Sequence, residues 1–103
     1  MSKKEIRKIF NHIVFSRDAN QCRYPGCTER AVDAHHITDR HEMPNGGYVL
    51  SNGISLCSCH HWEAEEFHRT RGKSGLTPDY FYALIGSSFN KAYEDSEKLD
   101  VHK

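Results

Sequence analysis

The sequence predicts a single small α+β domain, in which short strands in the middle of the chain lie between helices at its two ends. The length of 103 residues suits one domain, assigned to residues 1–103, with room for only a modest core. Apolar residues recur at helical spacing near both ends, and the short apolar runs between them are separated by Gly, Pro and Asn. Four cysteines and eight histidines add side chains that can brace a core of this size.

The first expected element is an amphipathic helix over residues 4 to about 17. Five apolar residues follow the spacing of one helix face there: Ile6, Ile9, Phe10, Ile13 and Val14. We interpret this face as a packing surface. The basic residues from Lys3 to Lys8 are interpreted either as a solvated face or as a phosphate contact.

Strand-like segments occupy the middle of the chain. Residues 31 to 37 are expected to form a short strand, and residues 39 to 47 contain the Pro, Asn and Gly of a loop. Tyr48–Leu50 and Ile54–Leu56 flank Ser51-Asn52-Gly53, which predicts a strand-like region with a tight Asn-Gly turn.

The rest of the chain, from His60 onward, is expected to be mainly helical. A helix from His60 onward is broken by the glycine-containing segment Arg71–Gly75, and Thr77-Pro78 then has the residue types of a helix start. An apolar stripe predicts one long C-terminal helix over about 77–97. We expect Trp62 and the aromatic residues of this stripe to lie in the core.

Charge and hydropathy argue against some classes of protein. Fourteen basic and fourteen acidic residues balance, which disfavours a protein that coats nucleic acid without specificity, because counterion release needs an excess of basic residues. No apolar run approaches the roughly twenty residues of a membrane span, and the N-terminus does not resemble a secretory signal. We therefore expect a cytoplasmic protein with no membrane partner.

The cysteines and one histidine have the spacing of a closed zinc site. A Cys-x4-Cys pair is followed by Cys-x2-His, and Tyr24-Pro25-Gly26 can turn the backbone so that the first two thiolates face one ion. Two disulfides in an exported protein are the alternative, but the nearby histidines favour metal. We expect structural Zn²⁺ at four ligands: Cys22, Cys27, Cys57 and His60. Cys59 in place of the histidine is an alternative fourth ligand.

The order of these motifs resembles the HNH endonuclease family over roughly residues 15–70. The matching motifs are Cys22-x4-Cys27, Asp33-Ala34-His35-His36-Ile37, Gly46-Gly47, Asn52-Gly53-Ile54-Ser55-Leu56-Cys57 and His60-His61-x3-Glu65. The chain is similar above all to phage-type members with a final Glu. The resemblance implies a ββα-metal (His-Me finger) fold, in which a strand hairpin and a helix grip one divalent cation and a zinc knuckle braces them. His60 stands where many members have a fourth cysteine, and this difference preserves zinc chemistry.

The resemblance also implies catalytic roles. His36 would be the general base that takes a proton from the attacking water. Asn52 would fix the hairpin loop and the base through side-chain hydrogen bonds, although a plain Asn-Gly turn also explains this residue. His35 would be a metal ligand. Successive side chains on a strand point to opposite faces, which would separate His35 from His36 unless the strand ends or bulges there.

His61 and Glu65 are the strongest local sign of a second cation. They stand four residues apart on the predicted helix, so their side chains share one face. With His35 they offer two imidazoles and one carboxylate, which can accept Mg²⁺, Mn²⁺, Ni²⁺ or Zn²⁺. We therefore expect one catalytic divalent cation. The expected catalytic residues are His35, His36, Asn52 and His61.

The expected partner is DNA. Arg40 is placed to hold the scissile phosphate, and Arg69, Arg71 and Lys73 are placed to hold neighbouring phosphates. One site in one domain predicts nicking by a monomer, and the oligomeric state stays open. RNA is an alternative substrate. A zinc-stabilised nucleic-acid-binding or adaptor module without catalysis is the alternative function, within a larger phage or restriction assembly of a bacterial or phage-infected host cell.

Overall fold

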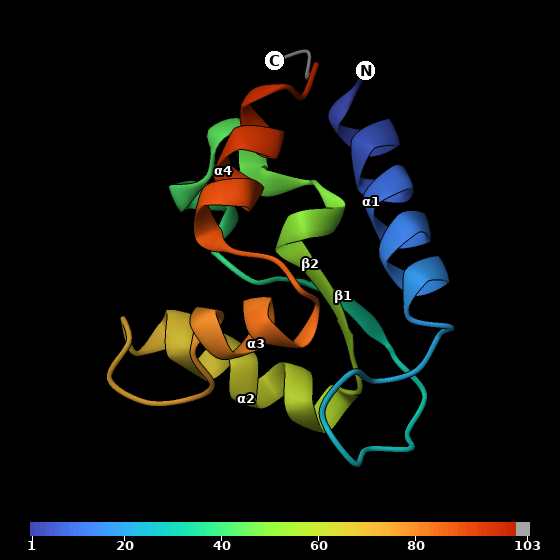
Figure 1. Ribbon diagram of the computed structural model, residues 1–103, viewed down its shortest axis with the longest axis vertical. Coiled ribbons are helices and arrows are strands. Elements are labelled where there is room, and N and C mark those ends of the chain that lie inside the picture. Colours follow the sequence, from blue (N-terminus) through green and yellow to red (C-terminus); the bar gives the residue numbers. More distant parts are fainter. Residues whose placement is uncertain (101–103) are drawn as a thin grey trace.

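Two short antiparallel strands form the centre of the structure, a computed structural model that describes residues 1–100 (Figure 1). β1 (Asp33–His36) pairs with β2 (Gly53–Leu56) from Asp33↔Leu56 to His36↔Gly53. In the described part four α-helices accompany them: α1 (Lys3–Arg17), α2 (Ser58–Arg69), α3 (Pro78–Leu84) and α4 (Phe89–Glu97). The predicted α+β class is therefore confirmed, while residues 101–103 of the expected domain lie outside the described residues.

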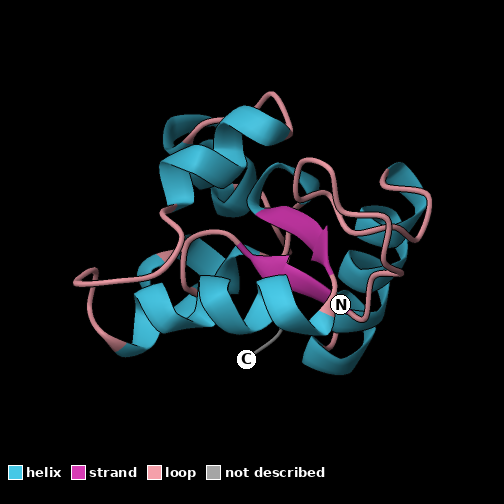
Figure 2. Ribbon diagram, turned by 90° about the horizontal axis from the view of Figure 1, so that it is seen from below, coloured by secondary structure: helices cyan, strands magenta, loops and turns pink. Residues whose placement is uncertain are grey.

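α1 is the predicted N-terminal helix, and it packs along the sheet. Its N-cap is Ser2, whose side chain accepts a hydrogen bond from the backbone N–H of Glu5. The face toward the strands buries three apolar residues: Ile6, Phe10 and Val14. A Cβ atom on Gly53 would lie 2.5 Å from Val14 Cγ2 and 2.8 Å from Phe10 Cε1. The glycine at the start of β2 therefore lets α1 lie this close, and Figure 2 shows the strands enclosed by helices.

The two faces of the sheet turn toward different helices. His36 and its partner Gly53 lie on the face covered by α1, where the His36 ring stacks on Phe10. His35 lies on the other face, where its ring meets that of His61 from α2 edge-on. β1 ends at His36, so side chains from both faces can border one space at the end of the strand.

The segment before β2 is not the strand that the sequence predicts. Residues Leu50–Asn52 form a 3₁₀ helix, and β2 pairs with β1 instead. A two-residue Asn-Gly hairpin turn needs positive φ at both residues, whereas Gly53 is extended with φ −125°. The prediction of a tight Asn-Gly turn is therefore wrong. The left-handed residues of this region stand earlier, at 45 to 47.

The C-terminal apolar stripe forms two helices where the sequence predicts one over 77–97. α3 begins as predicted, with Thr77 as N-cap and Pro78 in the first turn. Gly86 then has φ +66°, a conformation that commonly ends a helix. Ser88 caps α4 by accepting a hydrogen bond from the N–H of Lys91. This break lets α4 fold back onto the segment 44–52.

The core lies where β2, α2 and α3 meet. It contains apolar residues from each of these elements: Ile54, Leu56, Ala64, Phe81 and Tyr82. Tyr80, Phe89 and Tyr93 of the expected aromatic stripe are 39%, 44% and 41% exposed, so the prediction that they are core residues is wrong. It is also wrong for Trp62, which is 60% exposed. Its ring lies on the outside of α2, with the Arg69 guanidinium 4.7 Å from its centre. Within residues 1–100 no helix combines the length and the apolar character needed to cross a membrane.

Candidate metal centre

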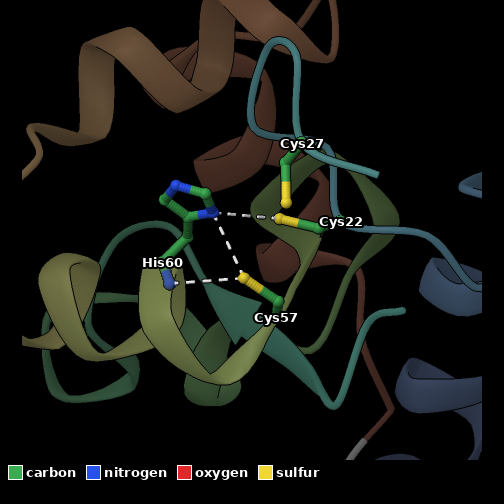
Figure 3. A group of neighbouring side chains, drawn as sticks. All are labelled: Cys22, Cys27, Cys57 and His60. Carbon is green, nitrogen blue, oxygen red and sulfur yellow. Dashed lines mark hydrogen bonds between the residues drawn. The ribbon is translucent and has the colours of Figure 1, made fainter. Parts of the chain in front are cut away.

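Three cysteines and one histidine come together beyond the end of β2 (Figure 3). The candidate ligand atoms of Cys22, Cys27, Cys57 and His60 all lie within 4.8 Å of one another. His60 Nδ1 is 3.2 Å from Cys57 Sγ and 3.5 Å from Cys22 Sγ. Three thiolates and one imidazole are the ligand set of a closed tetrahedral zinc site. The cluster can therefore hold a structural metal ion such as zinc, with the residues that the sequence predicts.

A turn, a helix cap and a stacked ring position these four residues. The backbone N–H of Cys27 donates to the carbonyl of Tyr24 at 3.0 Å, which closes the predicted turn. Cys57 is the N-cap of α2, and its Sγ accepts a hydrogen bond from the N–H of His60 at 3.5 Å. The ring of Tyr24 stacks on that of His60 with a centroid separation of 3.9 Å. The loop and the start of α2 thus hold each other in register.

Cys59 is exposed and lies outside the cluster, so His60 completes it instead of the alternative cysteine. Burial raises the pKa of the Cys22 thiol to about 11. This thiol therefore stays protonated at neutral pH without a cation, and a bound ion would favour its thiolate.

A second cluster joins the sheet to α2. His35 of β1 and His61 and Glu65 of α2 bring three candidate ligand atoms within 4.8 Å of one another. Glu65 Oε1 lies 3.2 Å from His35 Nδ1 and 3.3 Å from His61 Nε2. Glu65 and His61 share one helix face, as their spacing predicts. The structure thus brings together the three residues expected to hold a catalytic cation.

The chemistry of this second cluster fits a divalent cation. The Nδ1 atom of His35 is buried and makes no well-formed hydrogen bond, although Glu65 is close, so a ligated cation would satisfy it. Burial also lowers the pKa of His35, which keeps its imidazole neutral. The neighbouring His35 ring is the main cause that lowers the pKa of Glu65 to about 2. The cluster therefore presents the neutral imidazole of His35 beside an ionised carboxylate.

Asp33 orients one of these candidate ligands. Its Oδ2 atom lies 3.0 Å from His61 Nδ1, while His61 Nε2 points toward Glu65. A carboxylate on one nitrogen of a histidine fixes the tautomer that leaves the other nitrogen free to bind a metal. Asp33 stands in the motif Asp33-Ala34-His35-His36, but the sequence alone assigns it no role.

His36 borders a small hollow beside the second cluster. The hollow has a volume of about 250 Å³. Its lining residues are His36, Asp39, Arg40, His41, Glu65 and His68. The end of β1 explains this meeting, because His36 comes from the α1 face of the sheet and Glu65 from α2. His36 and Glu65 can therefore border one space although they lie on opposite sides of the sheet.

Two aromatic rings hold His36 in place. Phe10 stacks on its imidazole with a centroid separation of 4.5 Å, and Tyr48 packs edge-on at 4.7 Å. The His36 Nε2 atom is buried without a hydrogen-bond partner, so Nδ1 is the nitrogen left for the hollow. Burial lowers the pKa of His36 to about 4, so the ring is neutral at pH 7 and has one nitrogen lone pair free, and it is a weaker base than an ordinary imidazole.

Asn52 fixes the loops around the site. It is completely buried. Its Nδ2 donates to the carbonyls of Thr38 and Gly47, and its Oδ1 accepts from the N–H of Thr38. The expected loop-fixing role fits these contacts. Among the described residues no side-chain hydrogen bond joins Asn52 to His36. Asn52 instead holds the two residues that follow His36, because its backbone carbonyl accepts from the N–H of Ile37 at 2.9 Å and its side chain bonds to Thr38.

The residues expected to hold phosphates separate into two groups. Arg40 lines the hollow next to His36. Arg69 stacks on Trp62, and Arg71 and Lys73 are exposed in the turn after α2. The structure therefore does not bring the last three to the hollow.

Several residues around the two clusters were not singled out from the sequence. Asp33 could have been suspected, because it is a carboxylate close to the histidine pair. Phe10, Tyr48 and Tyr24 carry no such signal, since their histidine partners are distant in sequence. His68 lies one turn of helix beyond Glu65 and stacks on His35 with a centroid separation of 5.5 Å.

Comparisons with protein-family models, with curated proteins and with solved structures find no match to this chain.

Proposed function

We propose that this protein is a metal-dependent endonuclease of the HNH type that hydrolyses phosphodiester bonds in DNA. The observation that carries the proposal is the convergence of His35, His61 and Glu65 next to a hollow lined by the neutral imidazole of His36. A zinc-stabilised binding module needs the first cluster, but the second cluster would serve no purpose in it. The order β1, β2, α2, with candidate ligands on β1 and α2, also agrees with a ββα-metal arrangement.

The residues of the second cluster would hold one divalent cation. When bound, this cation supplies Lewis-acid stabilisation of the charge that builds up on the phosphate and the leaving oxygen. Asp33 keeps His61 in the tautomer suited to ligation. His35 needs no proton to be released before it binds, because its buried ring is already neutral.

His36 would act as the general base. Its Nδ1 can take a proton from a water molecule in the hollow, and its neutral state at pH 7 makes that nitrogen available. Phe10 and Tyr48 restrict the ring, which keeps the accepting nitrogen directed at one place. Arg40 can donate charge-assisted hydrogen bonds to the oxygens of the scissile phosphate. One such site in one chain cuts one strand at a time.

A supercoiled-plasmid assay tests this function. Purified protein is incubated with Mg²⁺, Mn²⁺, Ni²⁺ or Zn²⁺, and nicked circles are quantified for wild type, His36→Ala and His12→Ala. A positioned base typically contributes about 10²–10⁴-fold to a rate, so His36→Ala should lose at least about 100-fold. His12 is exposed on α1 away from the hollow, and its substitution should leave the rate unchanged.

Circular dichroism and zinc content must match across the three proteins for the comparison to hold. Cleavage that needs an added cation and disappears only in His36→Ala supports the nuclease. Absence of cleavage by folded, zinc-loaded wild type with every cation would favour the zinc-stabilised binding module. A parallel reaction with labelled RNA decides between the two nucleic acids.

A further inference from the structure

A second, larger recess adjoins the hollow that His36 borders. It has a volume of about 480 Å³. Its lining residues include Lys3, Arg7, Arg40, His41, Asn45 and Tyr48. Arg40 and His41 line both spaces. The two spaces therefore meet at Arg40 and His41, so a strand that occupies the hollow lies next to the recess.

The recess concentrates positive charge that the protein itself does not neutralise. Lys3, Arg7 and Arg40 line it, and no carboxylate does. Within residues 1–100 none of these three cations forms an ion pair. Other basic residues differ in this respect, because Arg17 and Arg23 pair with Asp18. A chain with zero formal net charge thus leaves a local surplus of positive charge beside the candidate active site.

Tyr48 connects the recess to His36. Its ring packs against the His36 ring at 4.7 Å, and its hydroxyl oxygen accepts a hydrogen bond from Arg7 Nε at 3.4 Å. Burial alone would raise the pKa of Tyr48, but the nearby Arg7 and Arg40 guanidinium groups lower it. Arg7 and Arg40 therefore lie close to the Tyr48 hydroxyl, and the ring of the same tyrosine contacts His36, the expected base.

We propose that this recess binds the phosphodiester backbone of a nucleic-acid strand on one side of the bond placed at His36. Lys3, Arg7 and Arg40 contact successive phosphates, because guanidinium and ammonium groups pair with phosphate oxygens. The position of the strand relative to the cleaved bond rests on the proposed nuclease function, but binding in the recess does not require cleavage. In this arrangement the bound strand runs along α1 and does not contact Arg69, Arg71 or Lys73.

Equilibrium binding measured without cleavage tests this recess. Fluorescence anisotropy of labelled DNA and RNA duplexes is recorded in a His36→Ala background, with no divalent cation added. Arg7→Gln should weaken binding by roughly five- to tenfold at low salt and reduce the slope of log K against log salt by about 0.9, the value of one phosphate contact.

The matched control is Lys8→Gln. Lys8 is exposed on the same helix and removal of its charge is equivalent, but it does not line the recess. It should change affinity far less than Arg7→Gln, and a Lys3→Gln/Arg7→Gln double variant should lose more than the single one. Helix content and zinc content are compared so that misfolding is recognised.

Equal affinities for the Arg7 and Lys8 variants would overturn the proposal, as would an effect confined to Arg71→Gln. A loss of affinity in Arg7→Gln with either duplex supports the proposal. The duplex that binds more tightly shows whether the recess prefers DNA or RNA. The result is separable from the proposed function. If binding depends on Arg7 but no plasmid is nicked, the recess is a binding site and the proposed nuclease function is wrong. If plasmid is nicked but neither binding nor nicking depends on Arg7, the nuclease function stands and the proposed recess is wrong.

Discussion

At the scale of single residues, Asn52 has the most fully satisfied polar side chain near the site. Its amide donates to the carbonyls of Thr38 and Gly47 at 3.1 and 3.2 Å. Its oxygen accepts from the N–H of Thr38 at 3.0 Å and from the hydroxyl of Tyr82 at 2.7 Å. Only an amide offers two donors and an acceptor in this shape. Asn52 thus ties the loop after β1 to the segment before β2 and to α3.

Asn52→Asp should destabilise the fold by about 2–4 kcal/mol, because a carboxylate oxygen would then face two buried carbonyl oxygens. Urea unfolding of the zinc-loaded protein measures the change. Asn90→Asp is the control, since Asn90 is exposed on α4. A loss at Asn52 no larger than that of the control would contradict the expectation.

Tyr82 predicts a pH dependence of stability. Burial raises the pKa of Tyr82 to about 12, whereas an unfolded tyrosine ionises near pH 10. The unfolded chain therefore loses this proton first, and stability falls as pH rises from about 10 to about 12. A difference of about two pKa units corresponds to at most about 2.7 kcal/mol.

Tyr82→Phe removes this titration. The advantage of wild type over Tyr82→Phe in the free energy of unfolding should therefore shrink across that pH window, while below about pH 9 it should be constant. Denaturant unfolding at several pH values measures both proteins. Parallel curves throughout would show that Tyr82 ionises at its ordinary pKa.

At the scale of elements, the approach of α1 to β2 determines where the expected base sits. Phe10 of α1 stacks on His36, and Gly53 of β2 leaves the space that Phe10 and Val14 fill. A side chain added at Gly53 meets Val14 and Phe10 first, so it disturbs His36 through α1 as well as through the strand pairing of Gly53 with His36.

Gly53→Ala should cost about 1–3 kcal/mol, because its Cβ would overlap side chains of α1. We also expect slower plasmid nicking, since Phe10 would move relative to His36. Gly86→Ala is the matched control. Its positive φ makes alanine unfavourable by about 1 kcal/mol, but nothing lies within 4 Å of the added Cβ. Equal nicking rates for the two variants would show that α1 does not position His36.

Local signals predict the helices well. Apolar spacing and a Ser cap define α1, and Thr77-Pro78 marks the start of α3. Two of the errors, the Asn-Gly turn and the single C-terminal helix, depend in part on contacts between distant segments. Asn52 turns its amide inward to Thr38 instead of making a hairpin turn. Ser87 donates to the carbonyl of Ser51, which helps to hold the break between α3 and α4.

At the scale of the whole molecule, both clusters depend on α2. Cys57 and His60 belong to its cap and first turn, and His61 and Glu65 follow directly. Their spacing along one loop and one helix is why the first ligand set and the His61/Glu65 pair are predicted from the residues, whereas His35, on β1, is added to the second set only by the family resemblance. The basic recess is different, because Arg7 and Arg40 come from separate elements, and only the folded chain brings them together.

Loss of the first cluster should unfold the protein. Structural zinc contributes about 10–16 kcal/mol of binding free energy in small domains, which matches or exceeds the total stability of about 5–15 kcal/mol of a typical domain. Cys27→Ser should therefore lose bound zinc and most helical structure. Zinc analysis and circular dichroism measure the two effects. Cys59→Ser should keep one zinc and a native spectrum. Loss of zinc in that variant would show that Cys59, and not His60, is the fourth ligand.

The dependence of both clusters on α2 has a consequence for the growing chain on the ribosome. His35 and His36 are made early, whereas Glu65 follows almost thirty residues later in the printed sequence. A nascent chain that stops before α2 contains histidines and thiols but no completed cluster. With the proposed function, cutting activity begins only after α2 has been translated and has folded, so products that end before α2 are harmless to nucleic acid.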